Sequence, residues 1–139
     1  VRLSRSGPRR VCLLSTGEAT VRLAAKERAL GAPSERTGKG GRNQEFALGV
    51  GWELYSRLAS AGSFAVLGAG SDGRDRPTDA AGAWVVSEVF SQAIQAGRDP
   101  GDFLRRHDSY RFFQKSGGLI RTGPTGTNLL DLRVVLLSR

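Results

Sequence analysis

Three short segments of this sequence combine glycine with polar side chains in patterns suited to binding an anion or a metal ion. The first is GKGGRNQE, residues 38–45. Backbone N–H groups at a helix start, the helix dipole and a guanidinium group together make an anion site. The alternative is a flexible helix entry with a solvated arginine. The candidate residues, two glycines before a predicted helix and three polar residues in its first turn, are Gly40, Gly41, Arg42, Asn43 and Gln44.

The second segment is GSDGRDRPTDAAG, residues 70–82, which follows a short apolar run. Asp72, Asp75 and Asp79 come after the carboxyl end of the predicted strand, where α/β sheets place ligands. Asp72 or Asp75 would hold Mg²⁺ there or orient a hydroxyl group. The alternative is that aspartate and glycine simply form turns.

The third segment is GPTGTNLLD, residues 123–131. Gly123 and Gly126 allow the backbone to form a concave nest of N–H groups, which is typical of phosphate sites. The alternative is a tight turn before the last predicted strand. Side chains that would bind phosphate oxygens lie beside the two glycines; they are Thr125, Thr127 and Asn128.

The run FAVLGAGSDG also has the spacing G-x-G-x-x-G, with Gly68, Gly70 and Gly73 after an apolar stretch. In a dinucleotide-binding fold a helix begins within this motif, and its N–H groups face the pyrophosphate. Pro77 would lie inside that helix, where proline removes a hydrogen bond and costs about 3 kcal/mol. The segment therefore predicts a strand followed by a polar loop, and the dinucleotide fingerprint fails.

Length and charge limit the possible function classes. The chain has 139 residues, the size of one domain with its own hydrophobic core. It contains no Met, so we expect it to be part of a longer polypeptide. Much of the net charge of +8 lies in residues 1–42, which hold ten Lys and Arg against three acidic residues. This region contains no aromatic residue and no segment of the chain is apolar enough to span a bilayer, so neither a nucleic acid nor a membrane is the expected partner.

The single cysteine, Cys12, excludes an internal disulfide and a cysteine-rich zinc site. We expect it to be a core residue, and we expect His107 to lie at a helix end or on the surface. The cysteine content favours a reducing compartment. We therefore expect a cytoplasmic protein, with the mitochondrion as the alternative.

Hydrophobic periodicity predicts strands that alternate with helices, and hence an α/β domain with a mixed β-sheet flanked by helices. This domain covers residues 11–139 and follows a basic linker or tail over residues 1–10. The continuous apolar run 64–67 predicts a strand that is covered on both faces. The predicted strands are 11–14, 19–23, 64–67, 81–86, 118–123 and 131–137, and the predicted helices are 43–61, 87–96, 99–106 and 109–116. A turn over 15–18 connects the first two strands, and a mobile loop over 24–41 leads from the second strand to the first helix.

Taken together and in this order, the polar segments resemble a known family. GEATV, GKGGRNQEFAL, SDGRDRPTDAAGAWV, HDSYRFF and TGPTGTNLLDLRVVL are similar to the C-terminal MOFRL domain of glycerate 2-kinases. The resemblance extends from about Val11 to the end of the chain, and GGRNQE with TGPTGTN is its most specific pair. One departure is Asp75-Arg76-Pro77-Thr78, because the family has glycine where this chain has Arg76.

The resemblance implies an active site between this domain and an N-terminal nucleotide-binding domain. The implied reaction transfers the γ-phosphoryl group of ATP to the 2-hydroxyl of D-glycerate with Mg²⁺. Arg42 would be a catalytic, charge-stabilising residue, and a catalytic lysine would belong to the other domain. In such a site Asp72 or Asp75 would hold the metal or the attacking hydroxyl. We expect the isolated fragment to be inactive.

Two other functions remain open at this point. One is hydroxypyruvate reduction, a name that relatives of the family have carried, although the failed dinucleotide fingerprint argues against it. The other is a non-catalytic binding or interaction domain that uses the basic segment 1–42.

Overall fold

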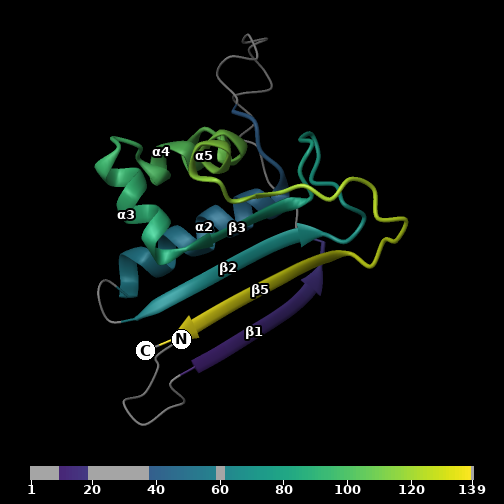
Figure 1. The fold of residues 1–139 in the computed structure, drawn as a ribbon, viewed down its shortest axis with the longest axis horizontal. Coiled ribbons are helices and arrows are strands. Elements are labelled where there is room, and N and C mark those ends of the chain that lie inside the picture. The colour runs from purple at the N-terminus through teal and green to yellow at the C-terminus, as the bar shows by residue number, and fades with distance from the viewer. Residues whose placement is uncertain (1–9, 19–37, 59–61, 139) are drawn as a thin grey trace.

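The computed structural model describes residues 10–18, 38–58 and 62–138. These residues form one five-stranded sheet with four helices packed against it (Figure 1). The strand order is β1-β5-β2-β3-β4. No helix in the described part of the chain is long and apolar enough to cross a bilayer. The elements are β1 (Arg10–Gly17), α2 (Arg42–Leu58), β2 (Ser63–Gly70), β3 (Gly82–Val86), α3 (Ser87–Gln95), α4 (Pro100–Arg105), α5 (Ser109–Ser116), β4 (Leu119–Ile120) and β5 (Asp131–Ser138).

The predicted α/β class is confirmed, but the strand directions differ from those of the mixed sheet that we expected. All four pairings between the described strands are antiparallel. β2 and β3 are joined by a loop that contains no helix, so the chain returns beside itself in the opposite direction. β5, the last strand, lies between β1 and β2 and pairs with both. Alternation of strands and helices in the sequence does not reveal this arrangement.

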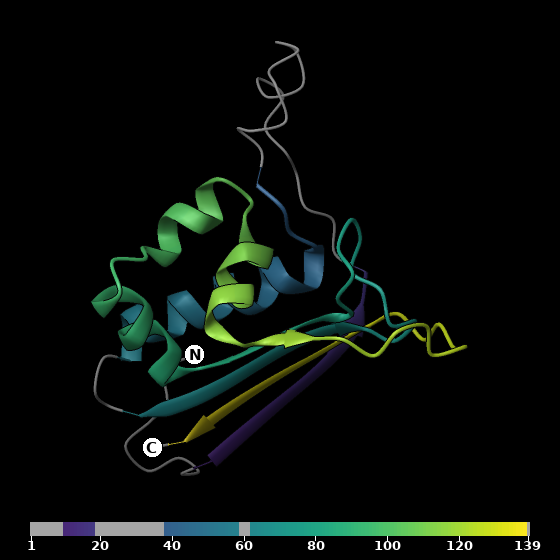
Figure 2. The same ribbon diagram turned by 45° about the horizontal axis from the view of Figure 1, so that its top comes forward.

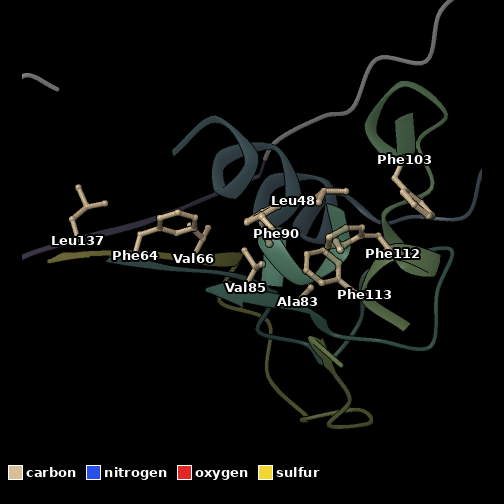
Figure 3. Close-up of a cluster of buried hydrophobic side chains, with 12 residues drawn as sticks. Leu48, Phe64, Val66, Ala83, Val85, Phe90, Phe103, Phe112, Phe113 and Leu137 are labelled. Carbon is tan, nitrogen blue, oxygen red and sulfur yellow. The ribbon is translucent and has the colours of Figure 1, made fainter. Parts of the chain in front are cut away.

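The four described helices all lie on one face of the sheet (Figure 2). α2 packs on β2 and β3 and buries Ala47, Leu48 and Gly51. α3 contributes Phe90, which is fully buried at the centre of the core (Figure 3). Its ring centroid lies 5.4 to 6.1 Å from those of four other aromatic residues, Trp52, Tyr55, Phe64 and Phe112.

Because the helices cover a single face, the expectation that strand 64–67 is covered on both faces is wrong for the described residues. Phe64 and Val66 are buried under the helices, whereas Ala65 and Leu67 alternate with them on the open face and are only half-buried. Cys12, which we expected in the core, is exposed. It lies on edge strand β1 and faces the open side.

Other element boundaries shift by a few residues. β1 is longer than predicted, because residues 15–17 pair with β5 where a turn was expected. The strand predicted over 118–123 is shorter, because only Leu119 and Ile120 pair with β3. The remaining described elements lie at the predicted places.

Three predictions concern residues outside the described part of the chain. They are the basic linker or tail, apart from Arg10 in β1, the strand over 19–23, and the mobile loop up to residue 37. These stay predictions.

Two glycines of α2 are expected to respond in opposite ways to substitution by alanine. A Cβ at Gly51 would lie 2.7 Å from Val85 and 2.9 Å from Phe90, whereas one at Gly49 would make only an ordinary 3.8 Å contact with Leu104. We expect Gly51→Ala to lower the free energy of unfolding by about 1–3 kcal/mol, because the core must repack. Gly49→Ala should raise it by up to about 1 kcal/mol, since alanine favours the helix. Thermal unfolding of both variants checks this; a stabilised Gly51→Ala variant would contradict the described packing.

Candidate functional site

One end of the sheet gathers all three polar segments that the sequence singles out. Gly17, Asp131 and Gly70 lie side by side there, because β1 and β2 end where β5 begins. The loops 71–81 and 121–130 extend from this end (Figure 1). Hydrogen bonds connect the start of α2 to both sides of the same region, through Asp75 and Asp131.

The helix start already holds an anion that the chain itself supplies. Asp75 is 2% exposed, and its two carboxylate oxygens accept hydrogen bonds from the backbone N–H groups of Asn43 at 3.0 Å and Gln44 at 2.9 Å. A Cβ at Gly41 would lie 2.2 to 2.5 Å from this carboxylate, so glycine is required for the close approach. Burial raises the pKa of Asp75, and the hydrogen bonds from Asn43 and Gln44 oppose that rise. The geometry favours Asp75 as a helix cap over the predicted metal ligand.

Asn43 and Gln44, predicted to bind phosphate, are buried and take part in internal contacts. The Asn43 amide donates to Asp131 at 3.0 Å, and the Gln44 amide donates to the Thr78 hydroxyl at 2.7 Å. Gly40 packs against α5, since a Cβ there would lie 2.4 Å from the Ser109 hydroxyl. These residues therefore fix the position of the helix start.

Arg42 is the residue of this segment that both contacts the buried network and reaches solvent. Its Nε and Nη2 donate to the two oxygens of Asp131 at 2.8 and 3.0 Å, which is a two-pronged ion pair. Asp131 is 1% exposed, whereas 39% of the Arg42 side chain is exposed. Nη2 also lies 3.4 Å from Glu18, at the end of β1. The hydrogen bond to Asp131 raises the pKa of Arg42, so the guanidinium stays charged.

Sequence reasoning missed Asp131 as a functional residue. Besides Arg42 and Asn43, it lies 3.5 Å from the guanidinium of Arg133, whose Nη2 donates to the carbonyl of Gly17. An acid that starts a mostly apolar strand, DLRVVLL, is a signal that could have identified it. It is the central carboxylate of this network.

The second and third polar segments are tied to each other. The Thr125 hydroxyl donates to the carbonyl of Ser71, and the backbone N–H of Leu129 donates to the Ser71 hydroxyl at 2.6 Å. Gly73 has φ +81°, and a Cβ there would lie 1.9 Å from the carbonyl oxygen of Gly123. The two loops therefore form one surface.

The two glycines of the predicted nest adopt the positive φ values that such a nest needs. Gly123 and Gly126 have φ values of +68° and +74°, and the loop from Arg121 to Leu130 is exposed throughout. A hollow of about 480 Å³ lies between this loop and the second segment. Its lining residues include Arg74, Arg76 and Asp79, so two arginines outnumber one aspartate and the net positive charge favours an anion. Thr127 and Asn128, predicted to bind phosphate, are exposed in the same loop.

Of the three aspartates in the second segment, Asp72 is the one with a half-buried carboxylate beside the nest. One of its oxygens accepts from the backbone N–H of Arg74 at 3.0 Å, and its carbonyl accepts from that of Thr125. Asp79 instead pairs with Arg121 at 2.9 Å. Hydrogen bonds from Tyr110 and Arg121 lower the pKa of Asp79 to about 2. The described residues contain no cluster of three or more His, Cys, Asp or Glu that could hold a metal ion by itself.

Glu45, the last residue of the first segment, forms a further titratable pair with His107. His107 follows α4, as expected for a helix-end residue, and its Nδ1 lies 3.6 Å from Glu45. Burial raises the pKa of Glu45, and attraction to His107 opposes the rise.

The segment with the spacing G-x-G-x-x-G runs from β2 into a turn and then to β3. No helix begins at its glycines, so the structure agrees with the failure of the dinucleotide fingerprint.

The structure is that of an α/β domain in which Arg42, paired with Asp131, and the glycine-containing loop 121–130 lie at the same end of the sheet. Residues 11–131 match the model of the MOFRL family. The chain therefore belongs to the MOFRL family, as the motifs indicated.

The relatives that the chain matches are much longer than the chain. It is 45% identical over 133 residues to a bovine glycerate kinase, and the aligned region covers 94% of this chain and 23% of the bovine protein. The crystal structure of a glycerate kinase from Thermotoga maritima has a TM-score of 0.76 at 36% identity, covering 97% of this chain and 29% of that one. A relative from Agrobacterium vitis, 42% identical over 125 residues, carries a provisional name as a hydroxypyruvate reductase and covers 90% of this chain and 26% of that protein.

Proposed function

We propose that this chain is the C-terminal domain of a glycerate 2-kinase and supplies one wall of an active site between two domains. An N-terminal nucleotide-binding domain would supply the other wall. The γ-phosphoryl group of ATP would pass to the 2-hydroxyl of D-glycerate, so that a new P–O bond forms to the substrate while the bond to ADP breaks. Family membership and the glycerate kinase names of relatives support this proposal.

The observation that carries the proposal is the Arg42–Asp131 pair. Phosphoryl transfer depends on positioned positive charge around the transferring group. Asp131 fixes two nitrogens of the Arg42 guanidinium from the buried side, while 39% of the side chain remains exposed. Arg42 is thus oriented before any ligand arrives, and it can stabilise charge on an anion from the other wall.

The loop over residues 121–130, which contains Gly123 and Gly126 (the nest loop), would bind phosphate oxygens at the same end of the sheet as this arginine. The backbone N–H groups around Gly123 and Gly126 and the exposed Thr127 and Asn128 are its candidate ligands. Mg²⁺ commonly binds through one or two carboxylates together with phosphate oxygens and waters. Asp72 is suited to that role, whereas both oxygens of Asp75 are taken by the helix. The metal would neutralise phosphate charge when bound.

Enzyme assays on the two-domain protein test the proposal. Purified protein with ATP, Mg²⁺ and D-glycerate should form ADP and 2-phosphoglycerate, identified by ³¹P NMR. Chain 1–139 alone should form neither, because half of the site is absent. NADH oxidation with hydroxypyruvate, in the absence of kinase activity, would favour the reductase instead. Binding of a macromolecule that requires residues 1–10 but not Arg42 would favour the non-catalytic domain.

Asp131 is expected to act as a positioning residue. Asp131→Asn keeps the size of the side chain but offers one acceptor where Arg42 needs two, so the guanidinium should shift. We expect kcat of the two-domain protein to fall on the order of 10²-fold, with a smaller change in KM. Asp102→Asn, on an exposed carboxylate of α4, is the control and should keep wild-type kinetics. An unchanged kcat in folded Asp131→Asn protein would contradict this role.

A further inference from the structure

The face of the sheet opposite the helices is apolar across four strands. The register between strands places alternate residues of β1, β5, β2 and β3 on this side. In an antiparallel sheet with one solvated face, the outward residues are normally polar. Here the outward residues include Leu14, Leu67, Trp84, Leu132, Val134 and Leu136. Their pattern is that of a sheet with two covered faces.

The exposure of these side chains is large for such an apolar surface. Leu14 is 67% exposed, Leu136 46% and Trp84 44%. The described helices all pack on the other face (Figure 2). Contiguous exposed apolar surfaces of this kind mark sites of protein association.

One end of the open face is hollowed. A groove of about 510 Å³ is lined by Cys12 and Leu136 on one side and by Val86 on the other, with the small Ala65 between them; Arg10 and Glu88 also contribute to its lining. A partner's apolar side chain would fit there.

The other end of the open face is continuous with the candidate active site. Leu132 follows Asp131 directly in β5 and faces the opposite side of the sheet. Leu129 and Leu130, 74% and 46% exposed, extend the apolar surface into the nest loop. A partner seated on the open face would therefore reach the end of the sheet that carries the Arg42–Asp131 pair.

We propose that this open face is the surface on which the N-terminal domain of the two-domain kinase docks. The proposal rests on the proposed function and adds the place of contact. Relatives of this chain are three to four times its length, since it covers 23–30% of them, so such a protein holds enough chain to cover the face. Docking here brings the N-terminal domain to the end of the sheet that carries Arg42, as an active site between the two domains requires.

Cys12, the single cysteine of this chain, reports on the docking. It is exposed and pairs with Leu136 on the open face. We expect iodoacetamide to alkylate Cys12 rapidly in chain 1–139 and at least about tenfold more slowly in the two-domain protein. There the thiol becomes accessible only when the two domains separate transiently. Peptide mass spectrometry separates Cys12 from cysteines elsewhere.

A cysteine on the helix side of the molecule provides the control. Gln92 is exposed on α3, so Gln92→Cys in a Cys12→Ser background should react equally fast in both proteins. The double variant Leu14→Lys, Trp84→Lys changes two side chains that are 67% and 44% exposed, so chain 1–139 should still fold. In the two-domain protein the two lysines should disrupt docking and restore fast alkylation of Cys12.

Equal reactivity of Cys12 in both proteins would overturn the docking surface, even if the two-domain protein phosphorylates glycerate. Protection of Cys12 in chain 1–139 itself that rises with concentration, together with a dimer in sedimentation, would overturn it in favour of a second copy. Protection in a two-domain protein without kinase activity would support the docking surface and count against the proposed function, so the two proposals fail separately.

Discussion

Replacing Arg42 with lysine in the two-domain protein is expected to lower kcat by about 10³-fold, by analogy with arginines that stabilise charge in phosphoryl transfer. The guanidinium donates to both oxygens of Asp131 at 2.8 and 3.0 Å and still has an exposed edge. A lysine is a single point charge and cannot bind Asp131 and a phosphoryl group in the same geometry. Initial rates with ATP and D-glycerate measure the effect.

The melting temperature separates this loss from unfolding. Lysine keeps a positive charge beside buried Asp131, so we expect a decrease of no more than about 5 °C. Arg57→Lys is the matched control, because Arg57 lies on the same helix, is 75% exposed and pairs with Glu53 on the helix surface. A change in kcat below about threefold for Arg42→Lys would leave the site assignment without support.

Asp75→Asn is expected to destabilise the domain by about 3 kcal/mol, which corresponds to a melting temperature about 10 °C lower. Both carboxylate oxygens of Asp75 accept backbone N–H groups of α2 in a buried place. The asparagine amide must turn its NH₂ toward one of those donors, so a buried N–H loses its acceptor. Thermal unfolding of chain 1–139 without Mg²⁺ measures the loss.

An exposed cap provides the comparison. Asp99 accepts from the backbone N–H of Gly101 at 2.9 Å, and its side chain is 58% exposed. Asparagine caps helices as well as aspartate, so Asp99→Asn should change stability by less than about 0.5 kcal/mol. If Asp75→Asn melts like the wild type without Mg²⁺ and differs only when Mg²⁺ is added, Asp75 is a metal ligand and the capping role is wrong.

Local patterns were enough to predict most elements and the family. The four-residue spacing of Phe46, Val50 and Leu54 predicted α2, because a helix brings such residues to one face. Pro77 was enough to exclude a helix at the glycines of the dinucleotide pattern, since proline cannot continue one. The polar motifs identified the MOFRL family, which the match over residues 11–131 confirms.

Local sequence patterns did not predict the contacts between distant segments. The antiparallel position of β5 depends on pairing with β1 across more than a hundred residues and with β2 across more than sixty. Hydrophobic alternation carries no strand direction. The pairing of β1 with β5 places Cys12 on an exposed edge strand, although a free cysteine was expected in the core.

The sequence by itself determined which residue types are available for chemistry: an arginine at a helix start, aspartates after a strand and a nest of glycines. Only the tertiary structure decided which of them face solvent. It turned Asp75 inward to cap α2 and placed Asp131, 89 residues from Arg42, behind the guanidinium. The physical reason is that a buried carboxylate needs donors wherever the fold supplies them, and those donors come from segments that are adjacent only after the sheet has formed.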